Sequence, residues 1–177
     1  MTLNELLKSD KARYGSVFGL NKPLYYKWQI CFRKASFYPK KSIRGIYYRL
    51  KLKILSERSG IQIPTDTCVG EGLFLGHNGR IIINSKARIG KNVNIATGVT
   101  IGKTNRGDRA GTPVIGNKVW IGTNAIIVGG ISIGDDVMIA PGAYVNFDIP
   151  AHSIVLGNPG KIYFREHATE GYINNLV

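Results

Sequence analysis

The most regular feature of this 177-residue chain is an aliphatic residue at nearly every sixth position through its second two thirds. Gly, Ala or Asn usually follows this lead residue. The lead positions are Val69, Leu75, Ile83, Ile89, Ile95, Ile101, Ile115, Ile121, Ile127, Ile133, Ile139 and Val145. All but two intervals are six residues, because Leu75 to Ile83 is eight and Ile101 to Ile115 is fourteen.

This six-residue period predicts a parallel β-helix. Each unit supplies one short strand whose lead side chain points inward, followed by a turn, and three units close one coil of about 18 residues. Stacked coils pair their strands in parallel and bury a continuous aliphatic column. The two longer intervals predict a small bulge beside His77 and an extruded loop over residues 102–114, and such interruptions often carry function.

Residues 1–60 follow a different, helical pattern. Thr2 and Glu5 form a weak capping box for a first helix, and from Lys41 the apolar positions recur with a helical period that ends near Gly60. The apolar face of this last helix consists of Ile43, Ile46, Tyr47, Leu50 and Ile54. We expect this face to pack on the main domain; the alternative is a peripheral contact with anionic lipid or a lipid-linked substrate. The chain then divides into residues 1–60, a β-helix over 61–163 and a tail over 164–177.

Most of the net positive charge lies in the helical segment. The chain has a net charge of +13, but residues 1–58 hold 14 Lys and Arg against 3 acids, whereas residues 59–177 hold 10 against 8. Ten aromatic residues lie between Tyr14 and Tyr48 in this segment. The uneven distribution argues against a nucleic-acid-binding protein and favours a local surface.

The remaining composition excludes several classes of protein. The two cysteines, Cys31 and Cys68, lie far apart, so they indicate neither a disulfide framework nor a metal site. No apolar run is long enough to span a membrane, and the first residues lack the pattern of a secretion signal. We expect a cytoplasmic protein, either free or held at the inner face of the membrane through residues 1–58.

The repeats also carry a specific series of motifs: V-G-E-G, L-G-H-N-G, I-G-K-N-V-N-I, I-G-N-K-V-W-I-G, I-G-D-D-V-M-I-A and G-N-P-G-K. The series resembles the hexapeptide-repeat acetyltransferases, and among them the serine acetyltransferase branch. The resemblance covers residues 60–163 and includes both interruptions. It implies a left-handed parallel β-helix, a homotrimer, and acetyl-CoA as acyl donor in grooves between neighbouring β-helices of the trimer. We expect no metal.

The resemblance also implies roles for individual residues. His77 matches the catalytic histidine, which would take the proton of an acceptor hydroxyl so that the acetyl group transfers directly. Positions implied to contact acetyl-CoA are Lys103, Thr123, Pro141, Asn146 and Lys161. Thr123 and Pro141 are 18 residues apart and should stack in successive coils. Each of these five residues could equally be an ordinary repeat position, and Trp120 is expected either to wall the groove or to pack between subunits.

Departures from the serine acetyltransferase pattern fall where the acceptor is bound. The family has Asp at the positions of Gly76 and Gln62 and His at that of Ala110, whereas Asp108 and Arg109 match. We therefore assign Gln62, Asp108 and Arg109 to acceptor binding, with Asp66 as another candidate to orient His77.

These departures lead us to expect an O-acetyltransferase in polysaccharide biosynthesis, with a sugar hydroxyl of a cell-envelope polysaccharide or exopolysaccharide, or of its precursor, as acceptor. One alternative is a serine O-acetyltransferase of cysteine biosynthesis. Another is a non-catalytic trimeric scaffold, and transfer to the nitrogen of an amino sugar would use the same base and groove.

Overall fold

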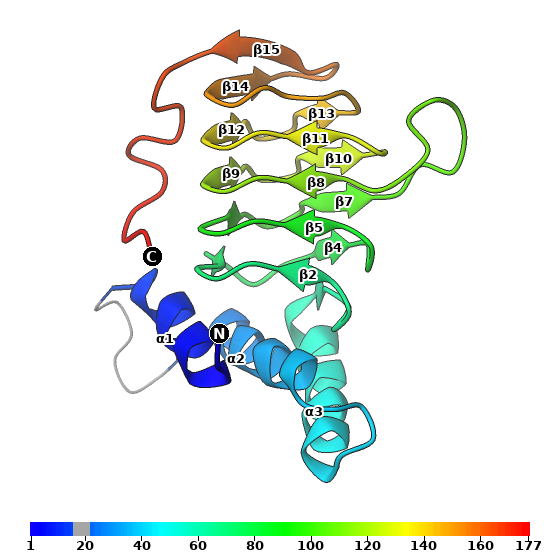
Figure 1. Cartoon of the computed structure of the whole chain (residues 1–177), viewed down its shortest axis with the longest axis vertical. Coiled ribbons are helices and arrows are strands. Elements are labelled where there is room, and N and C mark those ends of the chain that lie inside the picture. The colour runs from blue at the N-terminus through cyan, green and yellow to red at the C-terminus, as the bar shows by residue number, and fades with distance from the viewer. Residues whose placement is uncertain (16–21) are drawn as a thin grey trace.

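A computed structural model describes residues 1–15 and 22–177; Phe18, one of the aromatic residues of the basic segment, lies outside these ranges. Three helices, α1 (Leu3–Ala12), α2 (Leu24–Phe37) and α3 (Ile43–Ser59), lie at the base of a prism of short strands (Figure 1). The predicted capping box of Thr2 and Glu5 is present at the start of α1. α3 ends at Gly60, which adopts a left-handed conformation with φ of 79° and leads straight into the first strand.

The strands are β1 (Ile61–Gln62), β2 (Cys68–Val69), β3 (Phe74–Leu75), β4 (Ile81–Ile83), β5 (Arg88–Ile89), β6 (Asn94–Ile95), β7 (Thr100–Gly102), β8 (Val114–Ile115), β9 (Val119–Ile121), β10 (Ile126–Val128), β11 (Ser132–Ile133), β12 (Val137–Ile139), β13 (Tyr144–Val145), β14 (Ser153–Leu156) and β15 (Lys161–Phe164). They form three faces. Face A has the order β1-β4-β7-β10-β13, face B has β2-β5-β8-β11, and face C has β3-β6-β9-β12-β14-β15. All pairs are parallel except β14 with β15, which confirms the predicted parallel β-helix with short N-terminal helices.

The strand register shows how the two interruptions are accommodated. Paired residues in uninterrupted coils, such as Ile126 and Tyr144, are 18 positions apart. Ile61 pairs with Ile81, 20 positions on, so two extra residues lie within that coil, which includes the turn carrying His77. Thr100 pairs with Ile126, 26 positions on, and the eight extra residues project as a loop between β7 and β8 (Figure 1).

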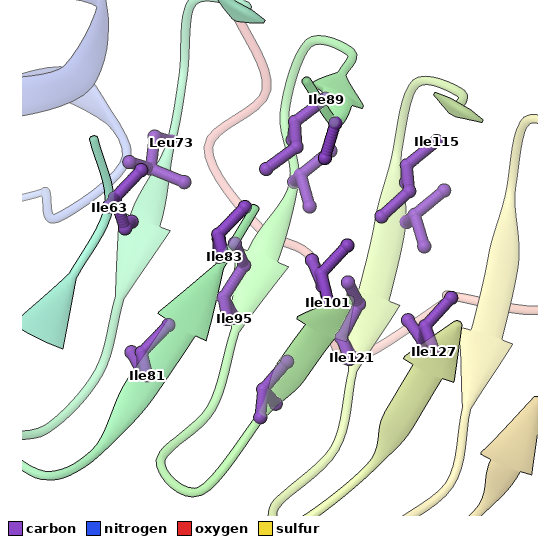
Figure 2. Packing of buried hydrophobic residues seen from close by; sticks show 14 of the residues in the cluster. Ile63, Leu73, Ile81, Ile83, Ile89, Ile95, Ile101, Ile115, Ile121 and Ile127 are labelled. Carbon is purple, nitrogen blue, oxygen red and sulfur yellow. The ribbon is translucent and has the colours of Figure 1, made fainter. Parts of the chain in front are cut away.

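The interior of the prism is the predicted aliphatic column. Every lead position from Leu75 to Val145 is buried, and Val69, at the first coil, is half-buried against the same core. Figure 2 shows side chains such as Ile89, Ile101 and Ile121, one from each of the three faces, pointing inward. Burying one such side chain contributes about 1.5–3 kcal/mol, so the stacked repeats supply a core that no single repeat could form.

The expected packing of α3 is wrong. Its predicted apolar face is exposed, and the helix is held instead through Leu52 and Leu55 on the opposite side, which join the same core cluster as Trp28 and Phe32 of α2. The indole Nε1 of Trp28 donates a hydrogen bond of 2.8 Å to the Ser56 hydroxyl. Leu52, Leu55 and this hydrogen bond together join α3 to α2.

The chain returns to its base after the last coil. β14 and β15 form an antiparallel hairpin, and residues 165–177, here called the C-terminal tail, run down beside the prism to the helices (Figure 1). Asn92 and Asn94 of the lower coils donate to the carbonyls of Val177 and Tyr172. Within residues 1–15 and 22–177, no helix is long and apolar enough to cross a membrane, and the cytoplasmic location stays a prediction.

Candidate active site

One corner of the prism, where face C turns into face A, carries His77, Thr97, Thr123 and Pro141 in successive coils. Each stands two positions after the lead aliphatic residue of its repeat, and we call this edge the histidine corner. Backbone hydrogen bonds link the coils here, because the Asn124 N–H donates to the Thr97 carbonyl at 3.0 Å and the Gly142 N–H donates to the Thr123 carbonyl at 2.8 Å. The structure therefore aligns His77 with two of the residues implied to contact acetyl-CoA.

A cavity of about 210 Å³ opens at this corner. His77 and Thr123 line it, together with the outward-facing side chains of Phe74, Asn94 and Trp120 from β3, β6 and β9. His77 itself is exposed. It lines a hollow that extends over three successive coils.

The turn carrying His77 depends on glycine. Gly79 has φ of +142°, and a Cβ there would lie 2.0 Å from Oγ1 of Thr97 in the next coil. Gly98 repeats the situation one coil higher, with φ of +80° and a Cβ that would lie 1.8 Å from Oδ1 of Asn124. Because the coils approach this closely, only glycine fits, and the backbone around His77 is fixed by the stacking.

The C-terminal tail borders this cavity. A second hollow of about 350 Å³ shares Phe74, Gly76 and Asn94 with the first, and Tyr172 and Asn174 of the tail line it. No site role was predicted for the tail, because its residues follow no repeat and match no motif. The buried guanidinium of Arg13 lies in the same place and donates to the Asn174 carbonyl at 3.0 Å.

Asp136 fixes the upper part of the tail. It accepts hydrogen bonds from the Thr169 hydroxyl at 2.6 Å and the Ala168 N–H at 3.1 Å, and it is paired with Lys118 and His152. Burial alone would raise the pKa of this carboxyl, but the hydrogen bonds from Thr169, Lys118 and His152 hold it far below its ordinary range.

The other implied acetyl-CoA contacts are spread more widely. Lys161 begins β15 at the top of face C, after a turn in which the Gly160 N–H donates to the Tyr144 carbonyl. Lys103 and Asn146 are exposed and lie beyond β7 and β13, where face A turns into face B, and we call this edge the loop corner. The structure therefore places Lys103 and Asn146 on a different edge from His77.

Asp108 and Arg109 also lie at the loop corner. They belong to the projecting loop, which is closed by an antiparallel bridge of Thr104 with Gly111. The Arg109 carbonyl accepts from the Gly130 N–H at 2.8 Å, and its guanidinium forms an exposed ion pair with Asp148 at 3.1 Å. Within one chain, these contacts hold both residues on an edge away from the histidine corner.

Neither candidate for orienting His77 contacts it. Gln62 is exposed on β1 and lines a separate hollow with Pro64 and Ile82, and Asp66 is paired with Lys40 at 3.0 Å. In the part of the chain that the structure describes, no hydrogen bond or ion pair to the His77 ring is present.

Comparison with known proteins agrees with this architecture. Residues 112–146 match the bacterial transferase hexapeptide (six repeats) family. Serine acetyltransferase 2 of Arabidopsis thaliana is 43% identical over 110 residues, which are 61% of this chain and 33% of that protein. The chain thus spans about a third of the length of this curated relative.

Solved structures agree over nearly the whole chain. The serine acetyltransferase of Brucella abortus strain S19 superposes with a TM-score of 0.77 at 27% identity, covering 94% of this chain and 70% of that one. Soybean serine acetyltransferase complexed with serine superposes with a TM-score of 0.75 at 25% identity, covering 91% and 69%. The chain therefore has hexapeptide repeats of the bacterial transferase type and serine acetyltransferase homologues.

These relatives overturn the predicted acceptor. We inferred a sugar hydroxyl and a role in polysaccharide biosynthesis from the replacements at Gln62, Gly76 and Ala110, but the relatives and the structural neighbours are named serine acetyltransferases. The inference was wrong because it treated the loss of individual contacts as a change of substrate.

Proposed function

We propose that this chain, with its hexapeptide repeats and serine acetyltransferase homologues, is an acetyl-CoA-dependent serine O-acetyltransferase with His77 as general base. The observation that carries the proposal is that the exposed His77 lines a cavity on the same corner as Thr123 and Pro141. Histidine side chains exchange protons near neutral pH, which suits the deprotonation of an alcohol.

The proposed reaction needs no covalent enzyme intermediate. His77 takes the proton of the serine hydroxyl as its oxygen attacks the thioester carbonyl, which forms the new C–O bond. The C–S bond then breaks, and the protonated imidazole returns its proton to the departing thiolate, so that O-acetylserine and CoA are the products. Backbone N–H groups near the turn would stabilise the negative charge that develops on the carbonyl oxygen.

The histidine corner fits an extended acyl donor. Small or compact side chains stand at Thr97, Thr123 and Pro141, so a pantetheine arm can lie along the edge. Lys161 stands exposed at the upper end of face C, where its ammonium group would attract phosphate groups of the donor. Lys103 and Asn146, on the loop corner, would meet a donor only if it is bound between two copies.

Arg109 and Asp108 are the groups that we assign to the two charges of serine. A guanidinium binds a carboxylate through two parallel hydrogen bonds, and a carboxylate is a partner for the ammonium group. The ion pair of Arg109 with Asp148 is half-exposed on both sides and is therefore weak. Arg109 can exchange this partner for the substrate at little cost.

The separation of the two corners supports a homotrimer. His77 and Arg109 lie on different edges of one prism, so a complete site requires a second copy whose loop corner faces the first copy's histidine corner. Three copies related by a three-fold axis satisfy this requirement at every interface and leave neither the histidine corner nor the loop corner unpaired.

Thiol release from acetyl-CoA tests the proposed activity. We expect turnover with L-serine, and the variant His77→Ala should lose about 10²–10⁴-fold of it because the general base is removed. Ethanolamine, which lacks the carboxylate, provides the matched acceptor: Arg109→Ala should weaken turnover of L-serine strongly and that of ethanolamine little. Absence of turnover with L-serine, or full activity of His77→Ala, would overturn the proposal.

Mixed trimers test whether the site is shared. His77→Ala and Arg109→Ala should each be inactive or nearly so alone. Co-expression should restore about a quarter of wild-type activity, because random assembly pairs an intact histidine corner with an intact loop corner at that frequency. If both residues acted within one copy, mixing would restore nothing.

A further inference from the structure

The outer side of α3 is an apolar stripe that no other part of the described chain covers. Ile43, Ile46, Tyr47, Leu50 and Ile54 recur every three or four residues, and their exposed fractions are 89%, 50%, 55%, 61% and 56%. The helix already has a complete packing side, through Leu52 and Leu55. We call the five exposed residues the α3 stripe. A stripe of this length is not explained by isolated surface hydrophobic residues.

Cations flank the α3 stripe along both of its sides. By helical spacing, Arg44 and Lys51 lie on one side and Lys53 on the other, and all three are exposed. The ammonium group of Lys51 lies 5.8 Å from the centroid of the Tyr47 ring. Glu57 is the one acidic residue within α3, near its C-terminal end. The apolar surface is thus framed by positive charge.

The same charge extends to the neighbouring helix. A hollow of about 220 Å³ between α2 and α3 is lined by Lys27, Lys34 and Lys51 around an apolar floor that includes Leu55. Lys34 also borders a second hollow with Lys8 and Lys11 of α1. The first hollow offers a place for an anionic group at the Lys51 side of the α3 stripe.

The charge distribution indicates what covers the stripe. Residues 1–58 carry a net charge of +11, against +2 for residues 59–177. A second copy docked stripe to stripe would bring two such segments together and would be opposed by their repulsion. An amphipathic helix with an apolar face, flanking lysines and an aromatic residue at its border matches the interface of an anionic bilayer, in which it lies parallel to the surface.

We propose that the α3 stripe and its flanking cations dock this protein on anionic lipid membranes, with α3 lying in the headgroup region. The apolar side chains enter the acyl boundary, and Arg44, Lys51 and Lys53 contact lipid phosphates. This inference is independent of the proposed acetyl transfer, because it uses none of the residues assigned to that reaction.

Co-sedimentation of the full-length protein with vesicles tests the proposal. We expect binding to vesicles of phosphatidylglycerol and phosphatidylcholine, little binding to phosphatidylcholine alone, and weakening as salt rises. Leu50→Ser with Ile54→Ser should reduce binding about tenfold. Arg44→Gln with Lys53→Gln should do the same for anionic vesicles. Equal binding to neutral vesicles, or unchanged binding by both double variants, would overturn the proposal.

Matched controls separate the stripe from general surface effects. Val114→Ser removes an exposed aliphatic side chain from face B, and Lys86→Gln with Arg88→Gln removes two exposed cations from the prism; neither change should alter vesicle binding. Sedimentation velocity of the same variants tests whether a second copy of the chain covers the stripe instead. If Leu50→Ser with Ile54→Ser lowers the oligomeric state and leaves vesicle binding intact, a second copy covers the stripe and the membrane proposal fails.

Discussion

The ring of Tyr172 lies against the indole of Trp120, with ring centroids 5.0 Å apart and planes inclined by 59°. Trp120 belongs to β9 and also lines the histidine-corner cavity, whereas Tyr172 belongs to the C-terminal tail. The Tyr172 carbonyl accepts a further hydrogen bond of 3.1 Å from Asn94. Two strands therefore hold the tail beside the proposed site.

This contact predicts a substrate-binding defect for Tyr172→Ala. An aromatic pair contributes about 0.5–1.5 kcal/mol, so loss of the ring should loosen the tail and raise KM for serine or acetyl-CoA about fivefold, with a smaller change in kcat. Tyr172→Phe keeps the ring and should behave as wild type. Steady-state kinetics of the two variants provides the measurement, and identical KM values in Tyr172→Ala and wild type would refute the prediction.

The Asp136 anchor predicts an acid-sensitive tail. Because the folded-state pKa of this carboxyl is lowered, its stabilising effect is complete above the unfolded-state value of about 3.9 and is lost as pH falls below that value. Asp136→Asn should expose the tail to limited proteolysis at pH 7 and should flatten the pH dependence of stability between pH 5 and pH 2. Glu170→Gln, at an exposed tail position, is the control; equal proteolysis of both variants would count against the anchor.

The ion pair of Asp10 with Arg33 predicts the largest loss of stability. These side chains are 2.7 Å apart and buried, and Arg33 also donates to the carbonyls of Val69 and Gly70 in the first coil. Asp10→Ala leaves a buried cation without its partner, which should lower the free energy of unfolding by about 3–5 kcal/mol.

The exposed pair of Lys40 with Asp66 provides the comparison for this prediction. The Lys40 Nζ and Asp66 Oδ2 atoms are 3.0 Å apart, but both side chains face solvent. Asp66→Ala should therefore cost at most about 1 kcal/mol. Urea denaturation measures both variants, and a similar loss for the two would show that burial does not decide the effect.

The two thiols should differ sharply in reactivity. Burial raises the pKa of Cys31 to about 11, although Lys51 and Lys34 act in the opposite direction, whereas Cys68 is exposed on β2. At pH 7.5 an aromatic disulfide reagent should modify one thiol per folded chain, and the second only after unfolding. Cys68→Ser should abolish the fast phase; a fast phase that survives in this variant would show that Cys31 is accessible.

The sequence alone was sufficient to predict the β-helical prism and the places of its two interruptions. Lead residues such as Ile95 and Ile121 repeat at a fixed period because each must fill the same interior column, and a departure from the period must leave the prism as a bulge or loop. His77 was assigned as a candidate base through its motif, and its position on one corner with Thr123 follows from the repeat.

Features that do not depend on the six-residue repeat were not predicted. Packing decides which side of α3 is buried, and the apolar period of Ile43, Leu50 and Ile54 is the same whether that side meets a core or stays exposed. The tail contacts of Tyr172 depend on where the chain travels after β15, which no local pattern specifies. The acceptor was misjudged because the replacements at Gln62, Gly76 and Ala110 were interpreted as a change of substrate, whereas the relatives and structural neighbours are named serine acetyltransferases.

The loop between β7 and β8 leaves the prism at one corner while the strands on either side keep their register, with Arg88 paired to Val114 and Thr100 to Ile126 across it. The length of this segment is therefore uncoupled from the core. A loop of different length or sequence could therefore replace this one while the prism stays intact. Such an exchange would change which substrate a site at this corner binds, at little cost to folding.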